Sequence, residues 1–72
     1  MHEIEIANRV RVARVGKGLT QQQLADAVGV TRQTIGLIES GNYNPTIKLG
    51  LLIGRATGTS LDELFWIGEA EL

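Results

Sequence analysis

The sequence predicts a mainly α-helical domain of five helices, with a short antiparallel two-stranded ribbon formed by its N- and C-terminal segments. Three observations predict this fold class. Five segments with apolar residues at helical spacing each follow a residue type that caps helix N-termini. Glycines follow three of these segments, at the position where helices commonly end. A two-residue alternation, which is typical of strands, is confined to the two ends of the chain.

The ribbon is predicted from the ends of the chain. Residues 3–6 read EIEI and alternate strictly between charged and apolar side chains, which predicts a strand. An isolated strand leaves its backbone donors and acceptors unpaired. We therefore expect residues 3–6 to pair with about residues 66–70.

The first two helices have clear start signals. Asn8 is placed to cap a helix over about residues 9–15. Thr20 and the glutamine three residues later form a capping box, which starts a second helix over about residues 21–28. A glycine directly after this helix ends it.

A third helix follows after only three residues, so that about residues 20–41 form a helix, a short turn and a helix. Thr31 caps the third helix, which runs to Ser40. At 100° per residue, Ile35 and Ile38 face one side. The opposite side carries a mixed set of residues: Arg32, Gln33, Gly36, Leu37 and Ser40. Glycine costs a helix about 1 kcal/mol relative to alanine, so we expect this face to contact a partner rather than to serve stability.

Residues 41–46, GNYNPT, contain the only proline and two asparagines and predict a loop. Thr46 caps a fourth helix over about residues 47–57. This helix has two apolar stripes, namely Leu49, Ile53 and Ala56, and Ile47, Leu51 and Gly54. We expect it to be the central, most buried helix, with Leu52 exposed between two basic side chains.

The fifth helix is short. Ser60 and Glu63 form a second capping box that starts it, and it continues to about Phe65. Three glycines at a spacing of four residues indicate close helix packing, and the last of them also ends the fourth helix: Gly50, Gly54 and Gly58.

Charge is unevenly distributed along the chain. The net charge of −1 by itself argues against nucleic-acid binding. Residues 6–48, however, carry six basic and two acidic side chains, and the acidic residues are concentrated at the two ends. A basic body with acidic ends is able to present a positive face to phosphates.

Several classes of function have no support in the sequence. There is no cysteine, and His2 is the only histidine, so we expect no disulfide, metal site or cofactor. Asp62 and Glu63 are explained by the capping box, and no nucleophile is paired with a general acid and base, so we expect no enzyme and infer no small-molecule ligand. The apolar runs are far shorter than the roughly 20 residues that cross a bilayer, which predicts a soluble cytoplasmic protein that does not engage a membrane.

The segment GLTQQQLADAVGVTRQTIGLIESGNYNPT, followed by TSLDELF, resembles the phage-repressor-like helix-turn-helix family, also called the Cro/repressor or XRE class. The resemblance extends over about residues 8–65, and the strand at each end and the loop GNYNP are most similar to the short dimeric cytolysin-repressor type. It implies a five-helix repressor-like DNA-binding domain over residues 1–72 and a regulator that binds a double-stranded DNA operator as a homodimer. It also implies a structural ion pair between Arg14 and Glu39. Gly36, Gly50 and Gly54 depart from the better helix formers that are usual in the family.

The resemblance also implies which residues contact DNA, and side-chain chemistry agrees with it. Arg32 and Gln33 are placed to read guanine and adenine edges in the major groove. Leu37 is placed to pack on a thymine methyl group, and Gly36 allows the backbone to approach the base edges. Gln21 starts the second helix, where backbone N–H groups attract a phosphate. The other expected phosphate contacts are Thr31, Thr34, Ser40, Asn42, Tyr43 and Asn44.

A dimer needs an apolar surface outside the helix-turn-helix. The apolar residues left over after the core is filled predict an interface with Trp66 near its middle, made by Leu61, Phe65, Trp66 and Ile67. In an alternative interpretation, Trp66 covers the core of its own monomer. An alternative function is the antitoxin half of a toxin–antitoxin pair, which would use the same DNA-binding core and regulate its own operon.

Overall fold

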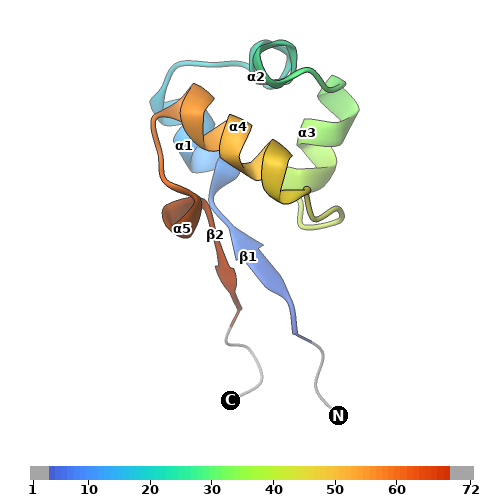
Figure 1. Cartoon of the computed structure of the whole chain (residues 1–72). Coiled ribbons are helices and arrows are strands. Elements are labelled where there is room, and N and C mark those ends of the chain that lie inside the picture. Colours follow the sequence, from blue (N-terminus) through green and yellow to red (C-terminus); the bar gives the residue numbers. More distant parts are fainter. Residues whose placement is uncertain (1–3, 69–72) are drawn as a thin grey trace.

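A computed structural model describes residues 4–68, and it confirms the predicted fold class (Figure 1). In this part of the chain, five helices and two strands follow one another in the predicted order. The elements are β1 (Ile6–Asn8), α1 (Val10–Gly16), α2 (Gln21–Val28), α3 (Arg32–Glu39), α4 (Ile47–Thr57), α5 (Leu61–Leu64) and β2 (Phe65–Ile67). None of these helices is long and apolar enough to cross a membrane.

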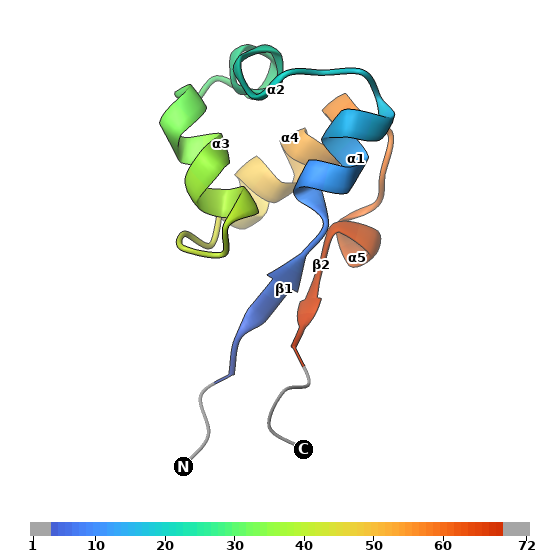
Figure 2. The same cartoon turned by 180° about the vertical axis from the view of Figure 1, so that it is seen from behind.

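All five helices contribute to one apolar core. The buried apolar side chains are Val10, Leu24, Ala25, Val28, Ile35, Ile38, Leu49, Ile53 and Leu64. Burying one large aliphatic side chain stabilises a fold by about 1.5–3 kcal/mol. As expected, α4 supplies more buried residues than any other helix. Figure 1 shows α4 across the middle of the helical body, and Figure 2 shows α1 on the opposite side.

The two strands form an antiparallel ribbon that projects from the helical body (Figures 1 and 2). Its register places Ile6 opposite Ile67, Ala7 opposite Trp66, and Asn8 opposite Phe65. Side chains alternate between the faces of a strand, so the isoleucine pair shares a face with Phe65, and Trp66 lies on the other face.

The strands lie closer to the helices than the sequence analysis predicted. The first strand begins at Ile6, so the prediction that residues 4 and 5 belong to it is wrong. Glu3 and residues 69–70, which were also predicted to pair, lie outside the described residues. Pairing starts at the helix ends, because the N–H of Arg9 donates to the carbonyl oxygen of Leu64 at 2.9 Å. The ends of α1 and α5 therefore determine the register.

Asn8 has two roles at the start of the first helix. The helix begins at Val10, one residue later than predicted, and its N-cap residue is Arg9 rather than the predicted Asn8. The Asn8 Oδ1 accepts a hydrogen bond from the N–H of Val10 at 3.0 Å, and its Nδ2 donates to the carbonyl oxygen of Ile38 at 3.0 Å. This side chain therefore stabilises the start of α1 and also connects β1 to the end of α3.

The other helix boundaries agree with the predictions within one residue. The second and fourth helices have the predicted limits, and α3 ends at Glu39, one residue earlier than predicted. The prediction that the fifth helix includes Phe65 is wrong. Phe65 has extended backbone angles, φ −135° and ψ 140°, because it pairs with Asn8 in the ribbon.

One face of α4 differs from the prediction. Ile47 and Leu51 were expected to form a buried stripe with Gly54, but they are 70% and 55% exposed. Leu52 was expected to be exposed, but it is half-buried against the core. The buried face of the helix is centred between the two predicted stripes, and it leaves Ile47 and Leu51 at its edge.

Two of the three regularly spaced glycines allow close packing against α4. A Cβ atom on Gly54 would lie 2.5 Å from the carbonyl oxygen of Thr59, and one on Gly50 would lie 2.9 Å from the Cδ1 of Leu61. Gly58 has another role, because it has a positive φ of 70° and forms the left-handed C-cap of α4.

Candidate nucleic-acid interface

Capping interactions fix the first residues of α2 and α3, and a short turn that begins with a glycine lies between the two helices. The Oγ1 of Thr20 accepts from the N–H of Gln23 at 3.0 Å, and the Thr20 N–H donates to the Gln23 side chain at 2.9 Å. Gly29 ends α2 with a φ of 80°, a conformation that favours glycine. Two residues later, the Oγ1 of Thr31 accepts from the N–H of Thr34 at 3.2 Å and starts α3. The two helices are therefore joined by a tight, well-defined turn.

The outer face of α3 is open to solvent, although its inner face is fixed in the core. Ile35 and Ile38 are buried, with 0% and 1% of their surface exposed. The exposed face carries Arg32, Gln33 and Leu37. Gly36 and Thr34 are half-buried beside them, and a Cβ atom on Gly36 would meet only the Nε2 of Gln21, at 3.9 Å. The structure thus brings the expected base-reading residues together on one helix.

A chain of hydrogen bonds connects this face to α1. Arg32 donates to the Oε1 of Gln21 at 3.0 Å, and the Nε2 of Gln21 donates to the Oε1 of Glu39 at 3.1 Å. Glu39 also accepts from the Nε of Arg14 at 2.6 Å, in an ion pair whose side chains are 6% and 11% exposed. Arg14 additionally donates to the carbonyl oxygen of Leu19 at 2.9 Å. The ion pair therefore fixes α1 to α3, and Gln21 extends it to Arg32.

These residues surround a polar cleft of about 680 Å³ where α1, the start of α2 and one side of α3 meet. Its lining includes Arg11, Arg14, Gln21, Gln22, Arg32 and Ser40. Neither Arg11 nor Gln22 was predicted from the sequence as a site residue. Arg11 precedes Arg14 by three residues, a spacing that places both side chains on one face of a helix. This spacing is the sequence feature from which a position of Arg11 beside Arg14 was predictable.

The loop after α3 places the remaining expected phosphate contacts on two different surfaces. The Nδ2 of Asn42 donates to the Oγ of Ser40 at 2.9 Å, and Ser40 lines the polar cleft. Tyr43 is exposed. Asn44 instead lines a second, apolar groove. The structure therefore brings Ser40 and Asn42 close to α3 and separates Asn44 from the polar cleft.

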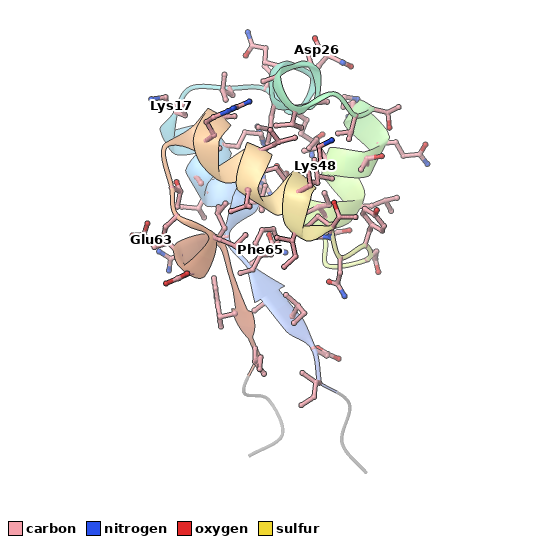
Figure 3. All side chains as sticks on the ribbon, in the orientation of Figure 1. Lys17, Asp26, Lys48, Glu63 and Phe65 are labelled. Atoms are coloured by element: carbon pink, nitrogen blue, oxygen red, sulfur yellow. The ribbon has the colours of Figure 1, made fainter. Side chains whose placement is uncertain are left out.

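The second groove has a volume of about 310 Å³ and lies between the start of α4, α5 and the ribbon. Its apolar lining includes Ile6, Pro45, Ile47, Leu61 and Phe65. Figure 3 shows Phe65 at the junction of the helical body and the ribbon. Leu61 and Phe65 were predicted from the sequence as interface residues. Ile6 and Ile47 were not, because Ile6 was assigned to the first strand and Ile47 to a buried stripe of the fourth helix.

The other two expected interface residues lie on the ribbon. Trp66 and Ile67 are 42% and 54% exposed, whereas Phe65 packs against the core. The guanidinium carbon of Arg9 lies 5.6 Å from the centre of the Trp66 ring, within the range of a cation–π contact. Trp66 therefore keeps a large exposed aromatic surface beside a positive charge.

The carboxyl group of Glu63 has a perturbed pKa. The backbone N–H of Ser60 donates to its Oε1 at 3.1 Å, and the Ser60 hydroxyl lies 3.0 Å from the same oxygen. These hydrogen bonds, together with the nearby Arg9 charge, hold the pKa of the Glu63 carboxyl below its ordinary value. Glu63 is therefore a capping carboxylate.

Comparison with known proteins identifies the family. The helix-turn-helix family matches residues 10–64. The HTH-type transcriptional regulator YgzD of Bacillus subtilis is 40% identical over 62 residues, which is 86% of this chain and 94% of that protein. The crystal structure of the restriction-modification controller protein C.AhdI from Aeromonas hydrophila is 31% identical, with a TM-score of 0.70 over 75% of this chain and 82% of that one. The structure of the clp gene regulator ClgR from Corynebacterium glutamicum is 28% identical, with a TM-score of 0.70 over 74% of this chain and 56% of that chain. The chain therefore belongs to the XRE, or Cro/repressor-like, helix-turn-helix family of DNA-binding transcriptional regulators.

Proposed function

We propose that the protein is a homodimeric repressor that occupies an inverted-repeat operator and inserts α3 into the major groove. The observation that carries this proposal is the outer face of α3, where an arginine and a glutamine project from a helix whose opposite side is anchored in the core. The projecting ribbon and the loop GNYNP further suggest the short dimeric cytolysin-repressor type. In this proposal, the whole chain is one DNA-binding domain.

The base contacts follow from the chemistry of this face. The guanidinium of Arg32 is suited to bind guanine O6 and N7, and the amide of Gln33 is suited to adenine N6 and N7. Leu37 offers an apolar contact to a thymine methyl group. Gly36 lacks a side chain and leaves space for the backbone to come close to the base edges. Each bidentate pair contributes about 1–3 kcal/mol of discrimination between bases.

Phosphate contacts surround this face and position it. Gln21 lies at the start of α2, and Thr31 and Thr34 lie at the start of α3, where unpaired N–H groups favour an anion. Ser40, Asn42 and Tyr43 extend the polar surface from the end of α3 into the following loop. Such contacts set orientation and affinity but not sequence preference. Asn44 fits this role less well, because it lines the apolar groove.

We place the dimer interface on the apolar groove and the ribbon, with Leu61, Phe65, Trp66 and Ile67 as its anchors. Ile67 lies on the same face of the ribbon as Phe65, which lines the groove, and the exposed Trp66 lies on the opposite face. Exposed large apolar residues on a small domain favour association. A two-fold axis here would present two α3 helices to half-sites about one helical turn apart.

Selection of bound duplexes from a random pool tests the proposal directly. We expect an enriched inverted repeat with half-sites about 10 base pairs apart, centre to centre. Two variants then distinguish residues that contact bases from residues that contact phosphates. Arg32→Ala is expected to weaken binding to the selected site and relax preference at one base, whereas Gln21→Ala is expected to weaken binding to every sequence. If no duplex from the pool competed with bulk DNA, specific recognition would be wrong.

A further inference from the structure

The polar cleft contains a basic residue that the helix-turn-helix pair does not supply. Arg11 is on α1, but it lines the same cleft as Gln21, Gln22 and Arg32. Its side chain is exposed, and among residues 4–68 no carboxylate lies within ion-pair distance of it. Arg11 therefore brings a charge from a third helix to the edge of the expected DNA-reading face.

The charges of the cleft do not balance. Its lining contains three arginines and one acidic side chain, Glu39. Arg14 neutralises Glu39, and all its donor nitrogens are occupied by Glu39 and by the carbonyl oxygen of Leu19. Arg32 donates to the neutral side chain of Gln21. The cleft thus retains two positive charges, from Arg11 and Arg32, with no carboxylate left to compensate them.

The kind of ligand follows from this arrangement. Two guanidinium groups beside a polar cleft attract an anion, and guanidinium geometry matches phosphate oxygens especially well. Gln21 and Gln22 are the first two residues of α2, and the N–H groups in that turn have no helical acceptor. The lining therefore offers two arginine side chains that have no carboxylate partner in the cleft, and its one carboxylate is already bound.

We propose that Arg11 is a phosphate clamp, in which α1 holds a DNA backbone phosphate beside the bases that α3 reads. This inference rests on the proposed function, because the phosphate belongs to the DNA that α3 engages. Arg11 makes no base contact and supplies affinity without sequence preference. The DNA-contacting surface then includes α1 as well as α2 and α3.

The salt dependence of DNA binding measures this contact. Each neutralised phosphate contributes a slope of about −0.9 to the dependence of log affinity on log salt concentration. Arg11→Gln removes one such contact from each protomer of the proposed homodimer, so it is expected to reduce the slope by about twice that amount, on the selected operator and on a scrambled duplex alike. Over a fourfold increase in salt, the affinity of the wild type then falls about 12-fold further than that of the variant. Arg55→Gln, which removes an exposed arginine from α4 outside the cleft, is the matched control and is expected to keep the wild-type slope.

The outcomes separate this inference from the function on which it rests. Suppose that the wild type prefers its operator and that Arg11→Gln has the wild-type salt slope. The phosphate clamp is then wrong, whereas specific DNA recognition is supported. A wild type that prefers no duplex overturns the proposed function, whatever the slopes are. Equal slope changes in Arg11→Gln and Arg55→Gln also overturn the clamp, because they show a general effect of charge.

Titration with inorganic phosphate, followed by NMR, identifies the source of the anion. We expect only weak shifts at the backbone amides of Gln21 and Gln22, because a free ion lacks the rest of the DNA contacts. Saturation by free phosphate, combined with an unchanged DNA slope in Arg11→Gln, would assign the cleft to a free anion and overturn the proposal. Circular dichroism of Arg11→Gln checks the fold, which we expect to be intact because this side chain is exposed.

Discussion

Gly54→Ala is expected to destabilise the protein, although alanine is the better helix former. The new Cβ atom would lie 2.5 Å from the carbonyl oxygen of Thr59, which is backbone and cannot rotate away. The same turn contains the C-cap of α4, in which the N–H groups of Gly58 and Thr59 both donate to the carbonyl oxygen of Gly54. Overpacking costs about 1–3 kcal/mol, and distorting a capping hydrogen bond costs about 1 kcal/mol. The higher helix propensity of alanine offsets about 1 kcal/mol of this cost, so the free energy of unfolding is expected to fall by about 2 kcal/mol.

Gly36→Ala is the matched control in the same chain. Its Cβ atom would meet only a flexible side-chain nitrogen at 3.9 Å, so the helix propensity of up to about 1 kcal/mol is expected to appear as increased stability. Thermal unfolding measures both variants, since about 1 kcal/mol shifts the Tm of a domain this small by roughly 4–8 °C. We expect Gly54→Ala to lower the Tm and Gly36→Ala to raise it. A raised Tm in both would refute the packing argument for Gly54.

Three further outcomes are expected. Arg32→Ala is expected to cost about 1–3 kcal/mol of operator affinity and less on random DNA, as measured by fluorescence anisotropy; an equal loss on both would contradict base reading. Leu61→Glu and Trp66→Ala are expected to sediment as folded helical monomers with weaker operator binding, and variants that stay dimeric or unfold would count against the proposed interface. Because the pKa of Glu63 is lowered in the folded state, its contribution to stability is present above the ordinary glutamate value of 4.5 and is lost as the pH falls through the lowered pKa. In urea titrations across this range, Glu63→Gln is therefore expected to show a weaker loss of stability on acidification than the wild type; equal pH dependence would show that this carboxylate is not responsible.

The helix positions were predictable because their signals are local. Thr20, Thr31, Thr46 and Ser60 each cap the helix that the sequence analysis assigned to them. A cap and a helix start are separated by at most three residues, so a short window of sequence contains both. The exposed face of α3 was also predictable, since the helical period places its residues on the side of the helix away from the pair Ile35 and Ile38.

The errors concern contacts between distant segments. The register of the ribbon depends on where α1 and α5 end in space, and Phe65 leaves the helix because Asn8 is its strand partner. The exposure of Ile47 depends on which face of α4 packs against the core, and that face lies between the two predicted stripes. Arg11 was missed for a similar reason, because only the folded chain brings α1 to the same cleft as α2 and α3.

The hydrogen bond from Arg32 to Gln21 affects the entropy of binding. Ordering a side chain with many rotamers at an interface costs about 0.5–1.5 kcal/mol. In the free protein, Gln21 already restricts the guanidinium of Arg32, and the buried Arg14–Glu39 pair in turn restricts Gln21. Part of the ordering cost is therefore met when the protein folds, before DNA arrives. Loss of the Gln21 side-chain amide would therefore lower affinity in two ways, by removing the proposed phosphate contact and by returning conformational freedom to Arg32.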